Sequence, residues 1–324
     1  MLEKEIFNIK SSEDFERLSL EVFRFQYENV AVYRKFCNLL NTKISEVQSF
    51  EQIPFLPIQF FKSHKIMVEN LTEETIFTSS GTTGSITSKH FISDLKLYET
   101  SFLNAFKRQY GEPNNYAILA LLPSYLERDG SSLIYMVENL KAASKNPDSG
   151  FYLYETEALI EKLGELEKSN QKTLLIGVSY ALLDLIEMKN FQLKNTIVME
   201  TGGMKGRRKE MIKEELHEIL KRGFGVEKIH SEYGMTELLS QAYSTGDGIF
   251  NCPPWMKILT RDTEDALTYT HEKTGGINVI DLANLNSCSF IATQDLGKTY
   301  KDGSFEIIGR FDSSDIRGCN LMVL

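Results

Sequence analysis

The sequence has 324 residues, of which 42% are hydrophobic and 25% are charged. This composition supports a sizeable packed core and excludes an intrinsically disordered chain. The net charge of −9 argues against a nucleic acid or an anionic membrane as the main partner, since both carry the same sign of charge.

The cysteines and the N-terminus point to a reducing compartment. Cys37, Cys252, Cys288 and Cys319 are widely spaced and form no CxxC pair, which is typical of free thiols rather than of a disulfide framework. The N-terminal segment MLEKEIFNIKSSEDF lacks the apolar run of a secretory signal. No stretch approaches the roughly 18 apolar residues that a membrane span requires. We therefore expect a cytoplasmic protein that does not insert into membranes.

Helical periodicity begins near the N-terminus. Residues 11–40 open with Ser-Ser-Glu-Asp, a typical helix cap with acids in the first turn, and apolar residues then recur at helical spacing. Pro54 and Pro57 interrupt this pattern and predict a turn. A further helix is predicted over 94–111, and it should end at Gly111.

From residue 116 onward, apolar runs of strand length alternate with helical segments. The sequence predicts strands at 116–123, 173–179, 195–201 and 228–234, and helices at 131–143, 180–189 and 205–223, the last ending at Gly223. Such alternation is typical of parallel strands that are covered by helices on both faces.

The pattern changes near residue 265, where short alternating runs replace the helical signals. These runs predict a smaller antiparallel sheet that packs against the preceding part. We therefore expect an α/β fold in one large domain over residues 1–324. Its parallel, helix-flanked part would cover about 1–264, its antiparallel part about 265–312, and a tail over 313–324 would carry Cys319.

Residues 78–90, TSSGTTGSITSKH, concentrate small hydroxyl side chains and glycines just after an apolar pair and before a helical segment. A glycine-rich loop between a strand and a helix can direct several backbone N–H groups into one concavity, which suits a phosphate group. The GxxxxGK[ST] phosphate-loop pattern is absent, and a polar surface loop is an equally good interpretation of this stretch alone. The residues that would form a phosphate site are Ser79, Ser80, Gly81, Thr82, Thr83, Gly84 and Lys89.

Five segments resemble, in the same order, the motifs of the adenylate-forming enzymes. This superfamily includes acyl-CoA synthetases, firefly luciferase and the adenylation domains of peptide synthetases. TSSGTTG is similar to their phosphate loop, and the other four segments are Thr201-Gly202-Gly203, the SEYGMTE segment 231–237, the TQDLG segment 293–297 and the GRFD segment 309–312. The resemblance covers residues 77 to 312 and implies the large N-terminal domain of these enzymes.

The resemblance also implies ATP and Mg²⁺ as cofactors. On the adenine side, Gly202 and Gly203 would pack against the base, and the Tyr233 ring, followed by Gly234, would stack on it. Two carboxylates, one for a metal ion and one for the ribose, are what the rest of ATP requires.

The remaining motif residues would serve the ribose and the phosphates. By the resemblance, Asp295 binds the ribose hydroxyls, Thr236 contacts the α-phosphate and Glu237 holds Mg²⁺. Arg310 belongs to the hinge that closes the large domain of these enzymes.

Most adenylate-forming enzymes carry a catalytic Lys in a C-terminal domain of about a hundred residues, which follows the hinge. This sequence ends soon after Arg310, so we expect that domain to be absent. Lys89, Lys205, Arg207 or Arg310 would then serve the phosphates.

The whole chain is most similar to a shorter branch, the acyl-protein synthetases of bacterial bioluminescence. Enzymes of this branch convert a fatty acid to acyl-AMP, move the acyl group to a Cys near their own C-terminus and pass it to a partner reductase. Cys319 matches that position, and a thiolate is a good nucleophile toward a mixed anhydride. The resemblance therefore implies a fatty acid or another carboxylic acid as substrate.

Two alternatives stay open from the sequence. The acceptor thiol could belong to coenzyme A or to a carrier protein, or the chain could be a non-catalytic subunit that binds a nucleotide or an acyl group. His230 could line the acyl pocket or be packed in the core. Trp255 and the cysteines other than Cys319 are expected to be core residues, and the Cys and His residues do not cluster as zinc ligands would.

Overall fold

The computed structural model describes residues 2–80, 86–122, 130–202, 208 and 211–311. Within these residues, thirteen strands form one hydrogen-bonded sheet, and β2 (Thr75–Thr78) and β3 (Lys89–Ile92) form a separate antiparallel hairpin. In the large sheet, β1 (Leu56–Pro57) pairs in parallel with β14. The spatial order of the other strands is β12 (Tyr269–Thr270), β11 (Met256–Arg261), β13 (Gly275–Asp281), β14 (Phe290–Thr299), β15 (Phe305–Arg310), β10 (Ile249–Asn251), β9 (Ala242–Ser244), β8 (His230–Tyr233), β7 (Thr196–Thr201), β6 (Thr173–Val178), β4 (Ala117–Leu121) and β5 (Gly150–Phe151).

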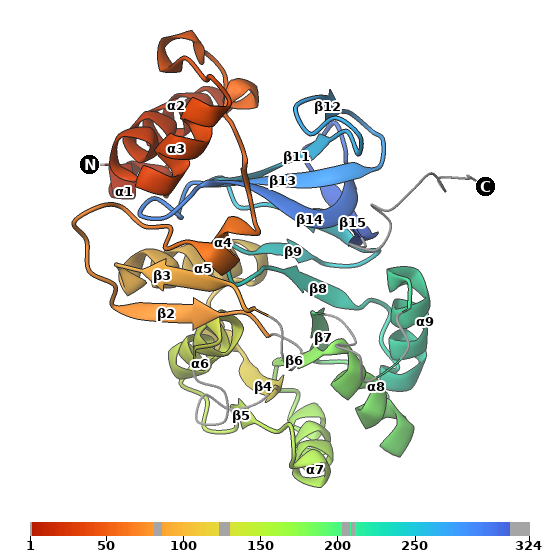
Figure 1. Cartoon of the computed structure of the whole chain (residues 1–324). Coiled ribbons are helices and arrows are strands. Elements are labelled where there is room, and N and C mark those ends of the chain that lie inside the picture. The colour runs from red at the N-terminus through yellow and green to blue at the C-terminus, as the bar shows by residue number, and fades with distance from the viewer. Residues whose placement is uncertain (1, 81–85, 123–129, 203–207, 209–210, 312–324) are drawn as a thin grey trace.

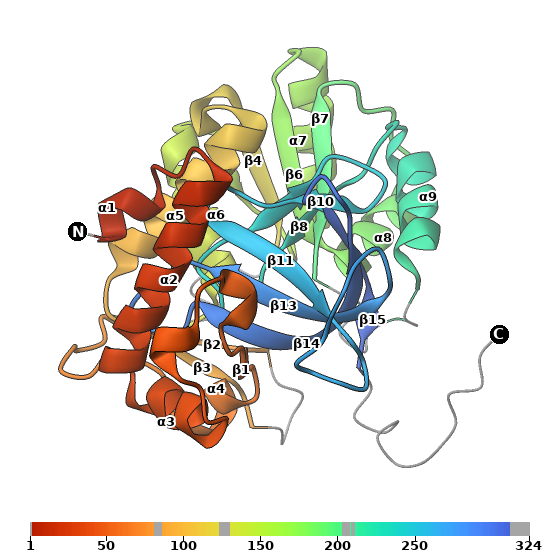
Figure 2. The same ribbon diagram turned by 90° about the horizontal axis from the view of Figure 1, so that it is seen from above.

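Helices cover both faces of the parallel part of the sheet. In Figures 1 and 2, α5 and α6 lie on one side of β4, β6 and β7, whereas α8 and α9 lie on the other. The α-helices are α1 (Leu2–Ile6), α2 (Ser12–Asn29), α3 (Ala31–Leu39), α4 (Phe60–Ser63), α5 (Leu95–Tyr110), α6 (Ser132–Ser144), α7 (Thr156–Lys168), α8 (Ser179–Met188) and α9 (Lys213–Phe224), and the short 3₁₀ helices are Ile44–Glu46, Phe50–Gln52 and Pro113–Asn115.

The two central parallel strands, β4 and β6, are buried along their whole length. Their sequences AILAL and TLLIGV are continuous apolar runs, as expected for strands that are covered on both faces. Parallel pairing continues from β5 through β4, β6 and β7 to β8. The predicted mixed α/β fold with helix-flanked parallel strands is confirmed.

The antiparallel part differs from the prediction in two respects. It is not a second sheet packed against the first, because β9 pairs with β8 and continues the same sheet toward β12. Antiparallel pairing also begins at Ala242, before residue 265. Strands β9 and β10 have only three residues each, which is too short for a clear alternating pattern to mark them in the sequence.

Helix ends follow local chemistry. As predicted, α5 ends at Gly111, which takes a φ of 82°. Helix α9 does not end at Gly223 as predicted but continues to Phe224, and Gly225 caps it with a φ of 67°. Gly223 instead lies where a Cβ atom would come within 2.6 Å of the Ile186 side chain. It is therefore a close-packing glycine between α9 and α8.

The segment 11–40, where helical spacing was predicted, forms the two helices α2 and α3. Ser11 caps α2 by accepting a hydrogen bond from the Asp14 N–H, as the Ser-Ser-Glu-Asp signature predicts. Val30 then takes an extended conformation, which separates α2 from α3.

The hydroxyl-rich stretch joins two strands, and this corrects the prediction of a loop between a strand and a helix. It runs from β2 to β3, and α5 begins only after β3. The strand containing Lys89 and His90 was not predicted, because β3 has only four residues, which are too few to show an alternating pattern. Residues 81–85 lie outside the described part of the chain.

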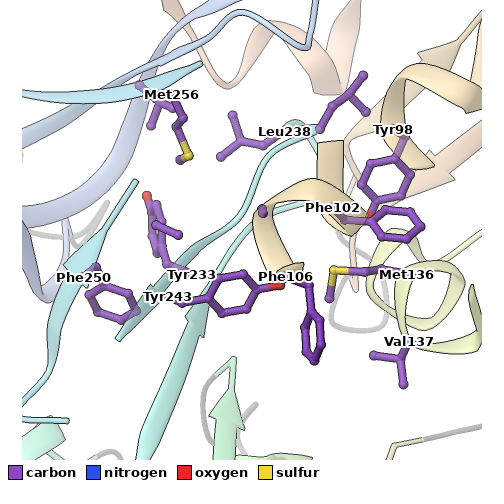
Figure 3. Packing of buried hydrophobic residues seen from close by; sticks show 14 of the residues in the cluster. Tyr98, Phe102, Phe106, Met136, Val137, Tyr233, Leu238, Tyr243, Phe250 and Met256 are labelled. Atoms are coloured by element: carbon purple, nitrogen blue, oxygen red, sulfur yellow. The ribbon is translucent and has the colours of Figure 1, made fainter. Parts of the chain in front are cut away.

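Aromatic side chains fill the space between α5 and the strands β8 to β10. Tyr243 of β9 lies between Phe250 of β10 and Phe106 of α5 (Figure 3). Trp255 is 1% exposed, which confirms it as a core residue, and its indole N–H is 3.0 Å from the hydroxyls of Ser101 and Ser240. Within the described ranges, none of the helices has the length and apolar composition needed to cross a bilayer.

Candidate active site

Residues from three of the sequence motifs meet at Asp295. The Tyr233 hydroxyl donates a hydrogen bond to Oδ2 of Asp295 at 2.9 Å, and Nε of Arg310 donates to Oδ1 at 2.8 Å. The antiparallel pairing of β14 with β15 sets Asp295 opposite Arg310. Asp295 is 4% exposed, and its carboxylate raises the pKa of the Arg310 guanidinium. The result is an oriented carboxylate beside an aromatic ring and a cation.

The segment after β8 carries Thr236 and Glu237, and other parts of the chain hold its backbone. The Thr236 carbonyl lies 2.8 Å from Nδ1 of His90, and the Glu237 carbonyl accepts a hydrogen bond from Nδ2 of Asn284 at 2.8 Å. The Asp281 carboxylate accepts hydrogen bonds from the backbone N–H groups of Leu239 and Ser240 and from the Ser240 hydroxyl. This segment is therefore positioned by side chains from β3, from the end of β13 and from the turn after it.

Glu237 places a carboxyl group inside the protein. It is 6% exposed, and this burial raises its pKa, although a hydrogen bond from the Ser88 side chain and the positive charge of Arg310 act in the opposite direction. Carboxylate and hydroxyl oxygens are the ligand types that Mg²⁺ prefers.

The hydroxyl-rich stretch is closed at its base by two serines. The Ser79 N–H donates to the Ser88 carbonyl at 3.1 Å, and the Ser88 N–H donates to the Ser79 hydroxyl at 3.0 Å. Ser80 is exposed beyond this pair. The predicted phosphate residues Gly81, Thr82, Thr83 and Gly84 lie outside the described residues, so the phosphate-binding role of this loop stays a prediction.

Lys89 lies on the outer face of β3. Successive side chains of a strand point to opposite faces, and Ser88 and His90 on either side of Lys89 both face the Thr236–Glu237 segment. The Lys89 side chain is exposed on the other face, opposite Thr78 of β2. A catalytic role for Lys89 therefore stays a prediction.

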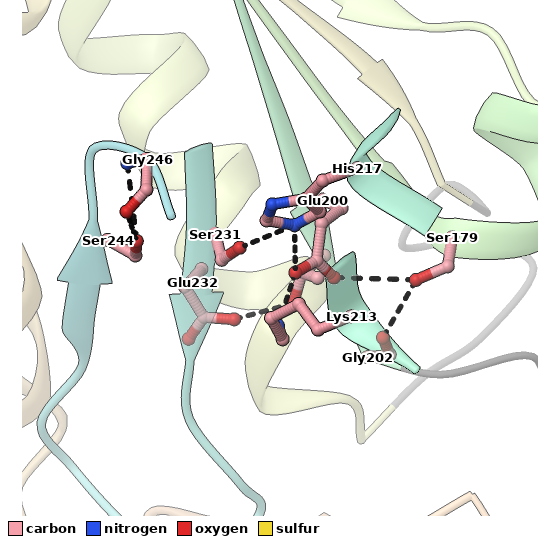
Figure 4. Close-up of polar contacts among 10 residues, drawn as sticks. Ser179, Glu200, Gly202, Lys213, His217, Ser231, Glu232, Ser244 and Gly246 are labelled. Carbon is pink, nitrogen blue, oxygen red and sulfur yellow. Dashed lines mark hydrogen bonds and ion pairs between the residues drawn. The ribbon is translucent and has the colours of Figure 1, made fainter. Parts of the chain in front are cut away.

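A buried polar network lies behind Gly202, where β7 ends (Figure 4). The Ser179 hydroxyl donates to the Gly202 carbonyl at 2.9 Å and lies 3.4 Å from Glu200. Burial alone would raise the pKa of Glu200, but the Lys213 ammonium at 2.5 Å and the neighbouring His217 lower it to about 2. The network fixes the end of β7; Gly203, Lys205 and Arg207 lie outside the described residues.

A second buried carboxyl group belongs to Glu232, one residue before Tyr233. Its Oε2 accepts a hydrogen bond from the Thr201 hydroxyl at 2.5 Å (Figure 4), and burial raises its pKa to about 7. Gly234 passes so close to Glu232 that an added Cβ atom would overlap the carboxyl group. A side chain at position 234 would therefore require the Glu232 carboxyl group to move.

The other candidates behave as packed groups or lie outside the described residues. His230 contacts the Tyr110 hydroxyl at 3.2 Å through Nδ1, and burial lowers its pKa to about 4. Burial raises the pKa of the thiols of Cys37 and Cys252 to about 12, and it also raises that of Cys288, which disfavours the reactive thiolate. Cys37 and Cys288 are core residues, whereas Cys252 is partly buried and packs against the core. Cys319 lies outside the described part of the chain.

Comparisons with known proteins identify the fold. No family model matches the sequence, and no curated protein matches it. Among solved structures, 2-hydroxyisobutyryl-CoA ligase in complex with 2-HIB-AMP and CoA matches with a TM-score of 0.68 at 13% identity, over 93% of this chain and 71% of that chain. The same ligase in the thioesterification state matches with a TM-score of 0.69 at 14% identity, over 94% and 70% of the two chains.

A second protein extends this result. ATP-bound MatB from Rhodopseudomonas palustris matches with a TM-score of 0.54 at 17% identity, over 75% of this chain and 49% of that chain. This chain has the fold of the adenylate-forming ligases. It spans about 70% of the length of 2-hydroxyisobutyryl-CoA ligase and about half of the length of MatB.

The adenylate-forming fold explains why residues distant in the sequence meet. Tyr233, Asp295 and Arg310 were predicted from separate motifs, and the structure brings them into contact. Sequence reasoning missed His90 and Asn284, which hold the Thr236–Glu237 backbone. His90 gave no usable signal, because the four residues of β3 are too few to reveal which side chains share a face of the strand. Asn284 gave no local signal.

Proposed function

We propose that this protein activates a carboxylic acid with ATP. A carboxylate oxygen of the acid attacks the α-phosphorus, the bond from that phosphorus to the bridging oxygen of the β-phosphate breaks, and an acyl-adenylate and pyrophosphate form. The contact of Tyr233 and Arg310 with Asp295 supports this reaction best, in a chain whose fold is shared with ligases solved with ATP or with 2-HIB-AMP.

Asp295 suits the ribose of ATP. Each carboxylate oxygen can accept two hydrogen bonds, and Tyr233 and Arg310 occupy one position on each of the two oxygens. One acceptor position on each oxygen therefore remains for two adjacent ribose hydroxyls. Arg310 contacts Asp295 through Nε, and its side chain is 75% exposed, so its other N–H groups can turn toward a phosphate.

Glu237 and Ser88 suit Mg²⁺ at the phosphates. Mg²⁺ binds through one or two carboxylates together with phosphate oxygens and waters, and it supplies charge neutralisation at the phosphates when bound. Within the described ranges, no group of three or more His, Cys, Asp and Glu side chains is arranged to hold a metal ion. Glu237 must lose its proton to act as a ligand, and burial raises the pKa of this carboxyl group.

The acyl group then passes to a thiol. The sulfur attacks the acyl carbon, the bond to the phosphate oxygen of AMP breaks, and AMP leaves as the thioester forms. We propose Cys319 as the first acceptor and a fatty acid as the substrate, with an acyl-accepting reductase or carrier protein downstream. Coenzyme A or a carrier protein as direct acceptor is the alternative.

The adenylation step is tested by ATP–pyrophosphate exchange with a mixture of straight-chain fatty acids. Asp295→Asn should raise the KM for ATP by about tenfold or more, because the amide presents one acceptor oxygen instead of two and carries no charge for Arg310. Asp247→Asn is the matched control, since Asp247 is exposed and has a φ of 59° that Asn also tolerates. Unchanged kinetics in Asp295→Asn would remove the ribose assignment.

The thiol step is tested by intact-protein mass spectrometry after incubation with Mg-ATP and the same fatty acids. A gain of one acyl mass that is absent in Cys319→Ser would support self-acylation and identify the acid. AMP release without any mass gain would assign the acceptor to an external thiol. Neither mass gain nor AMP release would favour a non-catalytic binding subunit.

A further inference from the structure

Two consecutive backbone carbonyls of the segment after β8 are held by one pair of side chains. His90 approaches the Thr236 carbonyl with Nδ1 at 2.8 Å, and Asn284 donates to the Glu237 carbonyl with Nδ2 at 2.8 Å. The two side chains also contact each other, with 3.0 Å between Nε2 of His90 and Oδ1 of Asn284. We call this pair the His90–Asn284 bridge. His90 is 0% exposed and Asn284 is 1% exposed, so water does not compete for these contacts.

The chemistry of the partners fixes the orientation of the bridge. A carbonyl oxygen can only accept hydrogen bonds, so Nδ1 of His90 must carry a proton toward Thr236. For the same reason the amide nitrogen of Asn284 must face Glu237, which leaves its oxygen toward Nε2 of His90. Because burial lowers the pKa of His90 to about 4, the ring is neutral with its proton on Nδ1, so the approach of Nε2 to this oxygen is a packing contact and not a hydrogen bond. The Phe61 ring packs edge-on against the imidazole, with 5.5 Å between ring centroids. The His90 ring is therefore confined by packing as well as by hydrogen bonding.

The bridge connects two segments that the proposed reaction needs together. His90 belongs to β3, which begins where the hydroxyl-rich stretch ends. On the same face of this strand, the Ser88 side chain lies near enough to the Glu237 carboxyl group to lower its pKa, and the Ser88 backbone is hydrogen-bonded to Ser79 at the base of the loop. The hairpin therefore adjoins Glu237 through Ser88 and contacts the Thr236 carbonyl through His90. Asn284 closes the connection from the turn after β13.

From this geometry we infer that His90 and Asn284 are positioning residues for adenylate formation, which hold Thr236 and Glu237 in fixed register with the hairpin of β2 and β3. The inference rests on the proposed function. The bridge contacts only the backbone of Thr236 and Glu237, so its removal leaves the side chains of Asp295 and Tyr233 in place. Displacement of Thr236 and Glu237 by about 1 Å is enough to reduce the rate of the chemical step by roughly 100-fold.

Exchange kinetics separate this role from ATP binding. His90→Phe and Asn284→Ala should each lower kcat for ATP–pyrophosphate exchange by roughly 30- to 100-fold, while the KM for ATP changes less than about threefold. His90→Asn should recover much of kcat, because an Asn amide nitrogen lies near the position of Nδ1 and can donate to the Thr236 carbonyl. His90→Gln should recover little, because its amide reaches the position of Nε2 instead.

Tyr33 provides a control for simple destabilisation. Its side chain is fully buried, and its hydroxyl donates to the Pro54 carbonyl at 2.7 Å, with no hydrogen bond to His90, Asn284, Thr236 or Glu237. Tyr33→Phe should lower the melting temperature but keep kcat within about threefold of wild type.

The outcomes distinguish the inference from the proposed function. If the wild type catalyses exchange and His90→Phe loses no more kcat than Tyr33→Phe, or if its loss lies entirely in KM, the positioning role is wrong and the proposed function stands. If the wild type shows no exchange, the proposed function and the positioning role are both wrong. A selective loss of kcat that His90→Asn restores and His90→Gln does not would establish the bridge.

Discussion

Glu232 shows how one buried side chain makes stability depend on pH. Its carboxyl group is 8% exposed and hydrogen-bonded to Thr201. Burial raises its pKa from 4.5 to about 7, so the folded protein keeps this proton to a higher pH than the unfolded chain. Between about pH 4.5 and pH 7 the unfolded state binds fewer protons than the folded state. Stability therefore falls as the pH rises through this window.

Glu232→Gln should remove this dependence. The amide oxygen can still accept the Thr201 hydrogen bond and carries no charge, so the variant should gain about 2 kcal/mol relative to wild type between pH 5 and pH 8. Urea unfolding at both pH values measures the difference. Glu200→Gln is the control: because the pKa of Glu200 is lowered to about 2, its carboxylate is ionised in both the folded and the unfolded state from pH 5 to pH 8, so this variant should lose a similar free energy of unfolding at both pH values. An equal effect of Glu232→Gln at both pH values would contradict the assignment.

At the scale of single residues, the motifs predicted the chemical types of the site residues better than they predicted which side chains contact each other. Tyr233, Asp295 and Arg310 were predicted from separate motifs, and both Tyr233 and Arg310 hydrogen-bond Asp295. Lys89 was expected to serve the phosphates; the structure places its side chain on the exposed face of β3, and its role stays a prediction. Which face a residue takes depends on where its strand begins, and four residues of sequence do not reveal that register.

The C-terminal end of helix α9 depends on the backbone conformation of Gly225. Gly225 has a φ of 67°, and a Cβ atom there would come within 2.6 Å of the Phe191 carbonyl oxygen. Gly225→Ala should therefore lower the free energy of unfolding by roughly 2–4 kcal/mol, from the left-handed backbone and the close contact together. Thermal unfolding measures this loss.

Gly164→Ala is the matched control for Gly225→Ala. Gly164 lies inside α7 with nothing within 4 Å of an added Cβ atom, so this change should stabilise the protein by about 0.5–1 kcal/mol. A similar loss in both variants would show that the cap geometry of α9 is not responsible.

At the scale of elements, long apolar runs were predictable and short pieces were not. The strands β4, β6 and β7 and the helices α5, α6 and α8 follow their sequence patterns closely. The hairpin of β2 and β3 was missed because each strand has four residues and the loop between them is polar. Its formation depends on the Ser79–Ser88 pairing and on contacts of Ser88 and His90 with a distant segment.

For the molecule as a whole, binding of ATP should be visible as stability. A ligand that binds only the folded state at about 100 times its Kd adds about 2.7 kcal/mol, which corresponds to a rise in Tm of roughly 4 °C for a chain of this size. Mg-ATP should produce this shift in the wild type and in Asp247→Asn. In Asp295→Asn most of it should disappear. A full shift in Asp295→Asn would place nucleotide binding elsewhere.

The sequence alone determined the mixed α/β class, the central parallel strands and the kinds of residue expected around a nucleotide, because periodicity and short motifs are local. The tertiary structure decided that parallel and antiparallel parts form one sheet, that Asp295 meets Tyr233 and Arg310, and that His90 and Asn284 bridge two carbonyls. Those contacts join residues up to 194 positions apart. Their geometry follows from strand order and register, which no local pattern encodes.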